Sequence, residues 1–345
     1  MGIKPAFENG KSAKLQLGCF WFIRGFRQPL IVVDASGLRR WLVAFSPTTL
    51  TSAFSSVTLG TALAWYLNGA FKPLIYVLTL IGVALAQAGV NLVHDYVDYS
   101  TGVDILYRAS GFAHRPNPII DLGLRPRSVR LAGYLMLAAA LTIGGVLAYV
   151  VGWPILILAA AGLLIGVGYS ERPLMLHYRG LGEVFAALAM GPLVTWGSYM
   201  TQVGLSANPS PLIVGIPNGL FTFLILIGSG ALEIDACRRV GKLTIVLMLG
   251  LRRIKYLVYG IVALMYASIV ASVALKYLPY LSLASLLLIP QTIRLAGPLL
   301  TGDEGEVRRR WRELRRLWAG PFSVRLIMLA IIIASMVVSR LFGIP

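Results

Sequence analysis

Carboxylates gather where a long apolar segment gives way to a polar one, at Asp95, Asp98 and Asp104. Asp95 and Asp98 are three residues apart, so on a helix they share one face, and a turn at Gly102 can bring Asp104 back towards them. Acidic groups that converge on one point repel each other unless a cation joins them. Such hard oxygen ligands suit Mg²⁺ bridging a diphosphate, although an ordinary solvated loop can show the same spacing.

A second acidic segment follows another apolar window, at Glu233 and Asp235. Glu233 and Cys237 are four residues apart and share a face, whereas Asp235 points roughly the other way if the helix persists. Arg238, Arg239 and Lys242 come directly after them and could neutralise a phosphate. The alternative explanation for each of these three basic residues is a cytosolic topology signal.

The elements that must position these residues are helices in lipid. Of the residues, 57% are hydrophobic and 13% are charged, with a mean hydropathy of +0.76, which does not fit a soluble surface. A helix needs about 20 mostly apolar residues to cross the hydrocarbon core, and lipid offers a bare backbone no hydrogen bonds. We therefore predict an all-α, polytopic membrane protein with nine transmembrane helices, at about 50–67, 73–93, 131–151, 154–169, 181–201, 212–232, 256–275, 278–293 and 322–339.

The lysines and arginines give an independent test of this count, because they concentrate in cytosolic segments. With the N-terminus cytosolic, all 31 fall in or around cytosolic segments except Lys72, Lys276 and Arg340. We therefore predict a multi-pass protein of the cell membrane with its N-terminus in the cytosol and its C-terminus outside. The acidic segments and a third polar segment, at 169–183, then share the cytosolic side.

Residues 1–49 are too long and too basic for a secretory signal, and we expect a cytosolic or interfacial lead-in to one membrane domain at 50–345. The net charge is +17, but the basic residues lie between apolar stretches, so membrane lipids and diphosphates are the expected partners and nucleic acid is not. The run at 308–316 indicates a headgroup anchor. The two cysteines, Cys19 and Cys237, provide neither a disulfide framework nor a CxxC metal site.

Three stretches resemble, in matching order, the UbiA superfamily of membrane prenyltransferases, and most closely its menaquinone branch, the 1,4-dihydroxy-2-naphthoate prenyltransferases. Residues 94–104 are similar to the family's NDxxD…D signature, which in that branch reads NDYFDYxxGxD. Residues 169–204 look like its YTxxP…YxxLGE…Y-x-Q-x-G segment. Residues 240–250 are similar to its AGKxTLAxxLG, which follows the second Asp-rich motif.

Two positions depart from the family pattern. His94 stands where the first motif begins with Asn, although Asn91 lies one turn earlier. Glu233 and Cys237 stand at the two acidic positions of the second motif, DxxxD. Glutamate can replace aspartate with a longer reach, but a thiol is a soft and poor ligand for Mg²⁺, and Asp235 could substitute for it only if the helix unwinds.

The resemblance implies a nine-helix fold of the UbiA type and Mg²⁺-dependent transfer of a prenyl chain from an isoprenyl diphosphate to an aromatic or polar acceptor. One or two Mg²⁺ ions would be held by Asp95, Asp98, Asp104 and Glu233, which would also carry the catalysis. The expected substrate-binding residues are Asn91, His94, Tyr169, Arg172, Arg179, Asp235, Arg239 and Lys242. Either His94 or Asp235 could take the acceptor's proton.

The residues of these motifs favour a naphthoate acceptor in menaquinone biosynthesis, with other aromatic acids and a glycerophosphate lipid as alternatives. The prenyl chain length and the oligomeric state stay open. A paralogue that binds quinone or prenyl lipid without turnover is the rival from another class. A transporter would carry charged residues near the middle of its spans, and few are found there.

Overall fold

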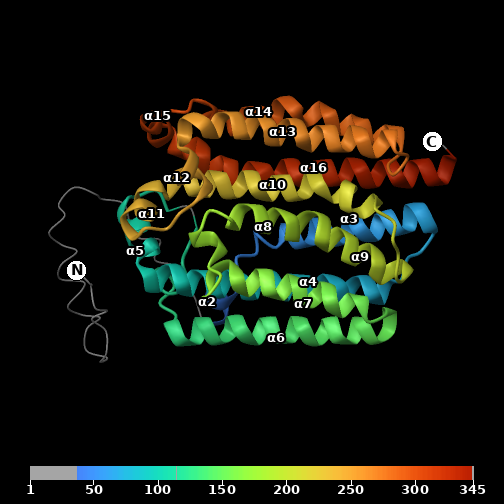
Figure 1. The fold of residues 1–345 in the computed structure, drawn as a ribbon, viewed down its shortest axis with the longest axis horizontal. Helices are drawn as coiled ribbons and strands as arrows, with labels where there is room; N and C mark the ends of the chain where they lie inside the picture. Colours follow the sequence, from blue (N-terminus) through green and yellow to red (C-terminus); the bar gives the residue numbers. More distant parts are fainter. Residues whose placement is uncertain (1–36, 114, 344–345) are drawn as a thin grey trace.

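The computed structural model describes residues 37–113 and 115–343, which form helices and their connections, with one isolated β-bridge between Arg179 and Leu243. The long helices lie side by side along one direction (Figure 1). The predictions made for residues 1–36, Cys19 included, lie outside the described ranges.

The long helices are α3 (Thr51–Asn68), α4 (Pro73–Thr101), α6 (Pro126–Val151), α7 (Pro154–Ser170), α10 (Ser210–Leu232), α13 (Leu251–Ala274) and α16 (Trp311–Phe342). The shorter α-helices are α2 (Gly37–Ala44), α5 (Val103–Ala109), α8 (Gly182–Leu188), α9 (Val194–Val203), α11 (Ile234–Val240), α12 (Ile245–Leu249), α14 (Ile289–Leu300) and α15 (Glu304–Arg309). Two 3₁₀ segments, η2 (Leu176–Tyr178) and η4 (Tyr280–Leu288), and a π-helical turn, η3 (Ala189–Leu193), complete the set.

Six helical segments of the described chain are long and apolar enough to cross a membrane, judged by length and composition. They are Pro73–Thr101, Pro126–Val151, Ser210–Leu232, Leu251–Ala274, Tyr280–Leu300 and Val324–Phe342. Pro154–Ser170 is apolar but shorter. The windows predicted at 50–67 and 181–201 fall on α3 and on the broken helix α8–η3–α9, neither of which is among the six. The all-helical membrane architecture is confirmed, and the count of nine stays a prediction.

Local sequence explains where several helices begin and how they pack. Proline stands in the first turn of α4, α6 and α7, where its missing N–H is not needed. A Cβ on Gly191, in the π-helical turn, would lie 2.6 Å from the backbone of Gly219 in α10. Small residues at these two positions therefore allow the two backbones to approach closely.

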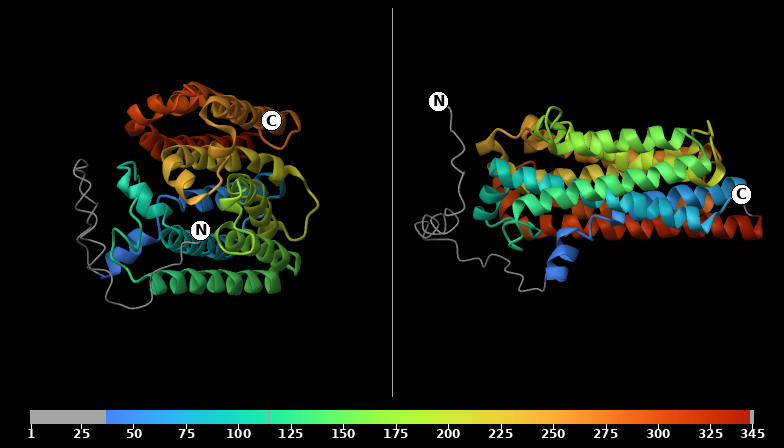
Figure 2. Two further views of the ribbon diagram at one scale, coloured as in Figure 1. Left: turned by 60° about the vertical axis from the view of Figure 1, so that its left-hand side comes forward. Right: turned by 90° about the horizontal axis from the view of Figure 1, so that it is seen from below.

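The short helices α5, α11, α12 and α15 gather at one end of the bundle, and α16 ends at the other (Figure 1). The right-hand view of Figure 2 shows the same arrangement, with α2, in dark blue, projecting from the side of the bundle. The predicted convergence of residues 94–104 and 233–242 at one end is therefore confirmed. Arg325 was one of the arginines assigned to cytosolic segments, but it is a buried residue within α16.

Candidate active site

The first acidic segment is a helix end followed by a sharp turn. Helix α4 does not stop at the predicted residue 93 but continues to Thr101, and Asp95 and Asp98 lie one turn apart on it. Gly102 follows in the left-handed conformation, with φ 87°, and α5 begins directly after it, with Asp104 in its first turn. All three carboxylates are buried, as a binding site requires and a solvated loop does not.

The second acidic segment reaches the first through Lys242. Helix α10 ends at Leu232, Glu233 forms the junction to α11, and Gly241 turns the chain so that Lys242 points back. Its Nζ lies 2.7 Å from Asp98 Oδ2 and 3.7 Å from Glu233 Oε2. Burial opposes the charge of Lys242, but the two carboxylates outweigh it and raise the pKa of Lys242 well above its ordinary value.

The loop between α5 and α6 supplies two partners that the sequence analysis did not single out. The Arg115 guanidinium binds both carboxylate oxygens of Asp95, with Nη1 2.9 Å from Oδ2. The Asn117 amide donates to Asp104, and the side-chain oxygen of Asn117 accepts from the backbone N–H groups of Ile119 and Ile120. This loop therefore covers the acidic helix end.

Aromatic and imidazole rings form the adjoining wall. The Tyr178 hydroxyl donates to Asp98 at 2.7 Å, and His94 Nε2 lies 3.5 Å from the same carboxylate. The ring of His177 is stacked on that of Tyr169, with centroids 4.7 Å apart. Burial and the neighbouring Lys242 charge lower the pKa of His177 well below its ordinary value, so this imidazole is neutral.

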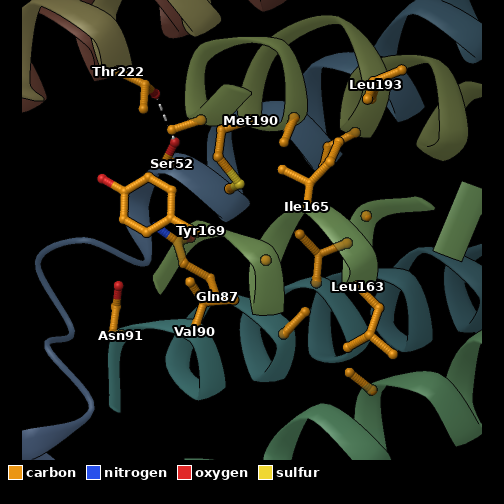
Figure 3. A pocket seen from close by; sticks show the side chains of 18 of the residues that line it. Ser52, Gln87, Val90, Asn91, Leu163, Ile165, Tyr169, Met190, Leu193 and Thr222 are labelled. Atoms are coloured by element: carbon orange, nitrogen blue, oxygen red, sulfur yellow. Dashed lines mark hydrogen bonds between the residues drawn. The ribbon is translucent and has the colours of Figure 1, made fainter. Parts of the chain in front are cut away.

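A cavity of about 350 Å³ lies between the helices beside this cluster. Figure 3 shows part of its lining, with Tyr169 from α7, Asn91 from α4 and Ser52 from α3 around one region, and Leu163 and Ile165 along an apolar wall. Of the predicted site residues, those in its lining are Asn91, His94, Tyr169 and Glu233. Arg115, His177 and the buried Arg325 also contribute to it. A mainly apolar cavity with a few polar groups at one part suits a small-molecule ligand.

Five predicted substrate-binding residues lie outside this cavity lining, and the buried Lys242 is one of them. Arg172, Arg179 and Arg239 are exposed, and Arg179 donates to the Pro173 carbonyl at 2.8 Å. Asp235 pairs at 2.6 Å with Arg308. The helix is interrupted at Glu233, but Asp235 pairs with Arg238 and Arg308 at the surface and does not face the cavity.

The buried carboxylates suit a divalent cation. Burial raises the pKa of Asp104 and that of Glu233, because neighbouring cations do not fully compensate for their charges. A hard dication would supply this compensation through carboxylate oxygens, so the donor set fits Mg²⁺. Cys237 is fully buried, and burial raises the pKa of its thiol to about 12, which leaves it protonated and a poor ligand.

The family model described as the UbiA prenyltransferase family matches residues 53–320. The zebrafish (Danio rerio) UbiA prenyltransferase domain-containing protein 1 is 27% identical over 311 residues, which are 87% of this chain and 84% of that protein. The 1,4-dihydroxy-2-naphthoate octaprenyltransferase of Escherichia coli is 30% identical over 219 residues, or 62% of this chain and 70% of that enzyme.

The fold has a solved counterpart, a UbiA homolog from Archaeoglobus fulgidus bound to DMAPP and Mg²⁺. It superposes with a TM-score of 0.56 and 14% sequence identity, over 84% of this chain and 99% of that one. At this identity the likeness shows the shared fold.

Proposed function

We propose that this chain, which belongs to the UbiA prenyltransferase family, transfers a prenyl chain from an isoprenyl diphosphate to an aromatic acceptor within the membrane. The observation that carries the proposal is the buried contact of Lys242 with Asp98 and Glu233, beside an apolar cavity. It joins two acidic segments that are far apart in the sequence. Such a cluster of charges suits a diphosphate, and the cavity beside it suits an apolar chain.

The charged end of the site would bind the diphosphate. Asp95, Asp98, Asp104 and Glu233 would hold Mg²⁺, which when bound neutralises the negative charge of the leaving diphosphate. The buried Lys242 and the partly buried Arg115 pair with Asp98 and Asp95 and would add positive charge around the phosphate oxygens. Arg172, Arg179 and Arg239 are exposed, and we assign them a role in attracting the diphosphate from the cytosol rather than in holding it.

The cavity would bind the prenyl chain and the acceptor. Its wall from α4, α6 and α7 includes Val90, Leu147 and Leu163, which offer a prenyl chain apolar contacts and exclude water from the allylic cation that forms when the diphosphate leaves. Its polar part, with Asn91 and Tyr169, would orient the acceptor ring for attack on that cation. Either His94 or Asp235 was expected to take the acceptor's proton, and only His94 lines the cavity.

For the acceptor we propose a hydroxylated naphthoate, as in menaquinone biosynthesis. The E. coli relative is named for this acceptor, and the motifs of this chain follow the same branch. We further propose nine spans in the cell membrane with the N-terminus in the cytosol, because that arrangement puts the acidic segments on the side where soluble diphosphates are found.

The test is incubation of the purified chain with labelled geranylgeranyl diphosphate, Mg²⁺ and a panel of acceptors. We expect a prenylated naphthoate, and little product from other aromatic acids or from a glycerophosphate. A product from glycerophosphate alone would support prenyl transfer and overturn the naphthoate assignment. Tight binding of the diphosphate without any product would identify a lipid-binding paralogue and overturn the proposed function.

A further inference from the structure

We propose that His94, Asp98 and His177 form a cation site that binds a transition-metal dication, such as Zn²⁺ or Co²⁺, in preference to Mg²⁺. One possible ligand atom from each residue lies within 4.8 Å of the other two. His94 and Asp98 come from the end of α4, and His177 comes from η2. The two imidazole rings lie 5.0 Å apart, centroid to centroid.

His177 provides a second and independent indication of a ligand. Its side chain lines the cavity, is 8% exposed, and has a buried Nδ1 with no hydrogen-bond partner among the described residues. A buried polar atom without a partner costs about 1–3 kcal/mol. The stacking on Tyr169 fixes the plane of the ring, so His177 is already held beside His94 and Asp98. The His177 nitrogen that lies within 4.8 Å of the other two ligand atoms can therefore bind a cation without giving up a hydrogen bond to a described residue.

The types of ligand decide the class of metal. Two imidazoles and one carboxylate suit Zn²⁺, Co²⁺ and similar ions, whereas Mg²⁺ prefers a shell of oxygen atoms. Catalytic zinc sites commonly use three protein ligands and leave a further position open. Because His94 and His177 line the cavity, a water or a phosphate oxygen in the cavity can take that position.

The surrounding charges accommodate an added dication. Asp98 already accepts a hydrogen bond from Lys242, but the Lys242 ammonium also lies 3.7 Å from the carboxylate of Glu233. A cation on Asp98 therefore leaves the ammonium beside a second carboxylate. Asp98 also keeps the hydrogen bond from Tyr178, which orients the carboxylate as outer partners of metal ligands do.

This inference does not depend on prenyl transfer, since it concerns metal binding by the chain alone. It makes His94, the residue that stands where the resemblance expects asparagine, a metal ligand in place of a proton acceptor, and it assigns a role to His177, which the proposed function does not use. Asp98 belongs to both ligand sets, so the identity of the metal at this end of the site depends on the two histidines.

The test is titration of the full-length, metal-stripped chain in detergent with Co²⁺, followed by visible absorption, and separately with Zn²⁺, both in the presence of a large excess of Mg²⁺. We expect one ion per chain, with a cobalt spectrum that indicates nitrogen ligands and four or five coordination. His94→Gln and His177→Gln should each weaken binding by about 100-fold or more, because loss of an outer partner alone costs about 10- to 100-fold and these two residues are direct ligands. Tyr169→Phe, which keeps the ring but offers no ligand, should bind as the wild type does.

An all-oxygen, octahedral cobalt spectrum would overturn the proposal, as would zinc affinity unchanged in both histidine variants or displacement of Zn²⁺ by Mg²⁺. Zinc-edge X-ray absorption on the unmodified chain gives an answer even if the variants do not fold, because it reports the number of bound imidazoles directly. Two are expected, and none would refute the site. A chain that binds cobalt in this way but transfers no prenyl group would leave the metal site standing and refute the proposed function alone.

Discussion

Removal of the Lys242 ammonium is the strongest test of the contact that joins the two acidic segments. Lys242→Met keeps an apolar stem and removes the charge. The Lys242 and Asp98 side chains are 0% and 1% exposed and 2.7 Å apart, and loss of one partner of such a buried pair costs about 3–5 kcal/mol because the other charge is left uncompensated. Asp98 keeps the hydrogen bond from Tyr178, so we expect the lower end of that range, about 3 kcal/mol.

The assay is the free energy of unfolding in bicelles, measured by steric trapping for the single variants Lys242→Met and Asp98→Asn and for the double variant. If the cost comes from the unpaired carboxylate, the double variant should be more stable than Lys242→Met, with a coupling energy of about 2 kcal/mol. Lys72→Met, at an exposed lysine, is the control and should change stability by no more than about 0.5 kcal/mol. A cost below about 1 kcal/mol for Lys242→Met with no coupling would show that the pair behaves as a surface pair, and the reasoning would be wrong.

Three further predictions address the carboxylates and the thiol. Asp95→Ala and Asp98→Ala should each lower prenyl transfer by about 100-fold or more, because several kcal/mol of transition-state stabilisation are lost. Asp104→Ala should cause a milder loss. Near-normal transfer by the first two variants would refute the metal assignment. Cys237→Asp places a carboxylate where burial disfavours negative charge. We therefore expect the thermal stability to fall without Mg²⁺ and to recover with it, and the turnover to be preserved or raised. Loss of turnover would show a separate role for the thiol. Cys237 is buried, and burial raises the pKa of its thiol to about 12. In a Cys19→Ser background it should resist maleimide at neutral and mildly alkaline pH and react after denaturation, because only the thiolate is nucleophilic. Rapid labelling of the folded chain, detected by mass spectrometry, would contradict its burial.

The sequence predicts the acidic helix end well, because its features are local. Asp95 and Asp98 share a face through helical spacing alone, and Gly102 adopts the left-handed turn that brings α5 and Asp104 back. The predicted end of the second span at 93 is wrong, because the acidic turns of α4 pack against other protein segments rather than lipid, and so the helix continues to Thr101. Hydropathy alone cannot separate burial in protein from exposure to water.

Partners that come from loops could not be predicted in the same way. Arg115 and Asn117 lie in a segment without periodicity, and only the fold brings them to Asp95 and Asp104. His177 was visible as part of a polar segment, but nothing in its spacing indicates that it would meet His94. Arg325 was grouped with a basic link, although it lies within the last apolar window; a charged residue inside a span is itself a sign of burial in protein.

The charge balance at this end of the bundle connects the fold to the chemistry. Apart from the contacts of His94, which is charged only when it is protonated, five carboxylates face three permanent cations in the ion pairs of the described residues that surround the site. The carboxylates are those of Asp95, Asp98, Asp104, Asp121 and Glu233, and the cations are Arg108, Arg115 and Lys242. Packing of the apolar helices does not need this excess of buried negative charge, and burial makes it costly. A bound dication would offset it and link α4, α5 and the junction of α10 with α11 through their carboxylates. Metal binding and the stability of this end of the fold would therefore be one equilibrium, and any ligand that stabilises the cation would also stabilise the helices around it.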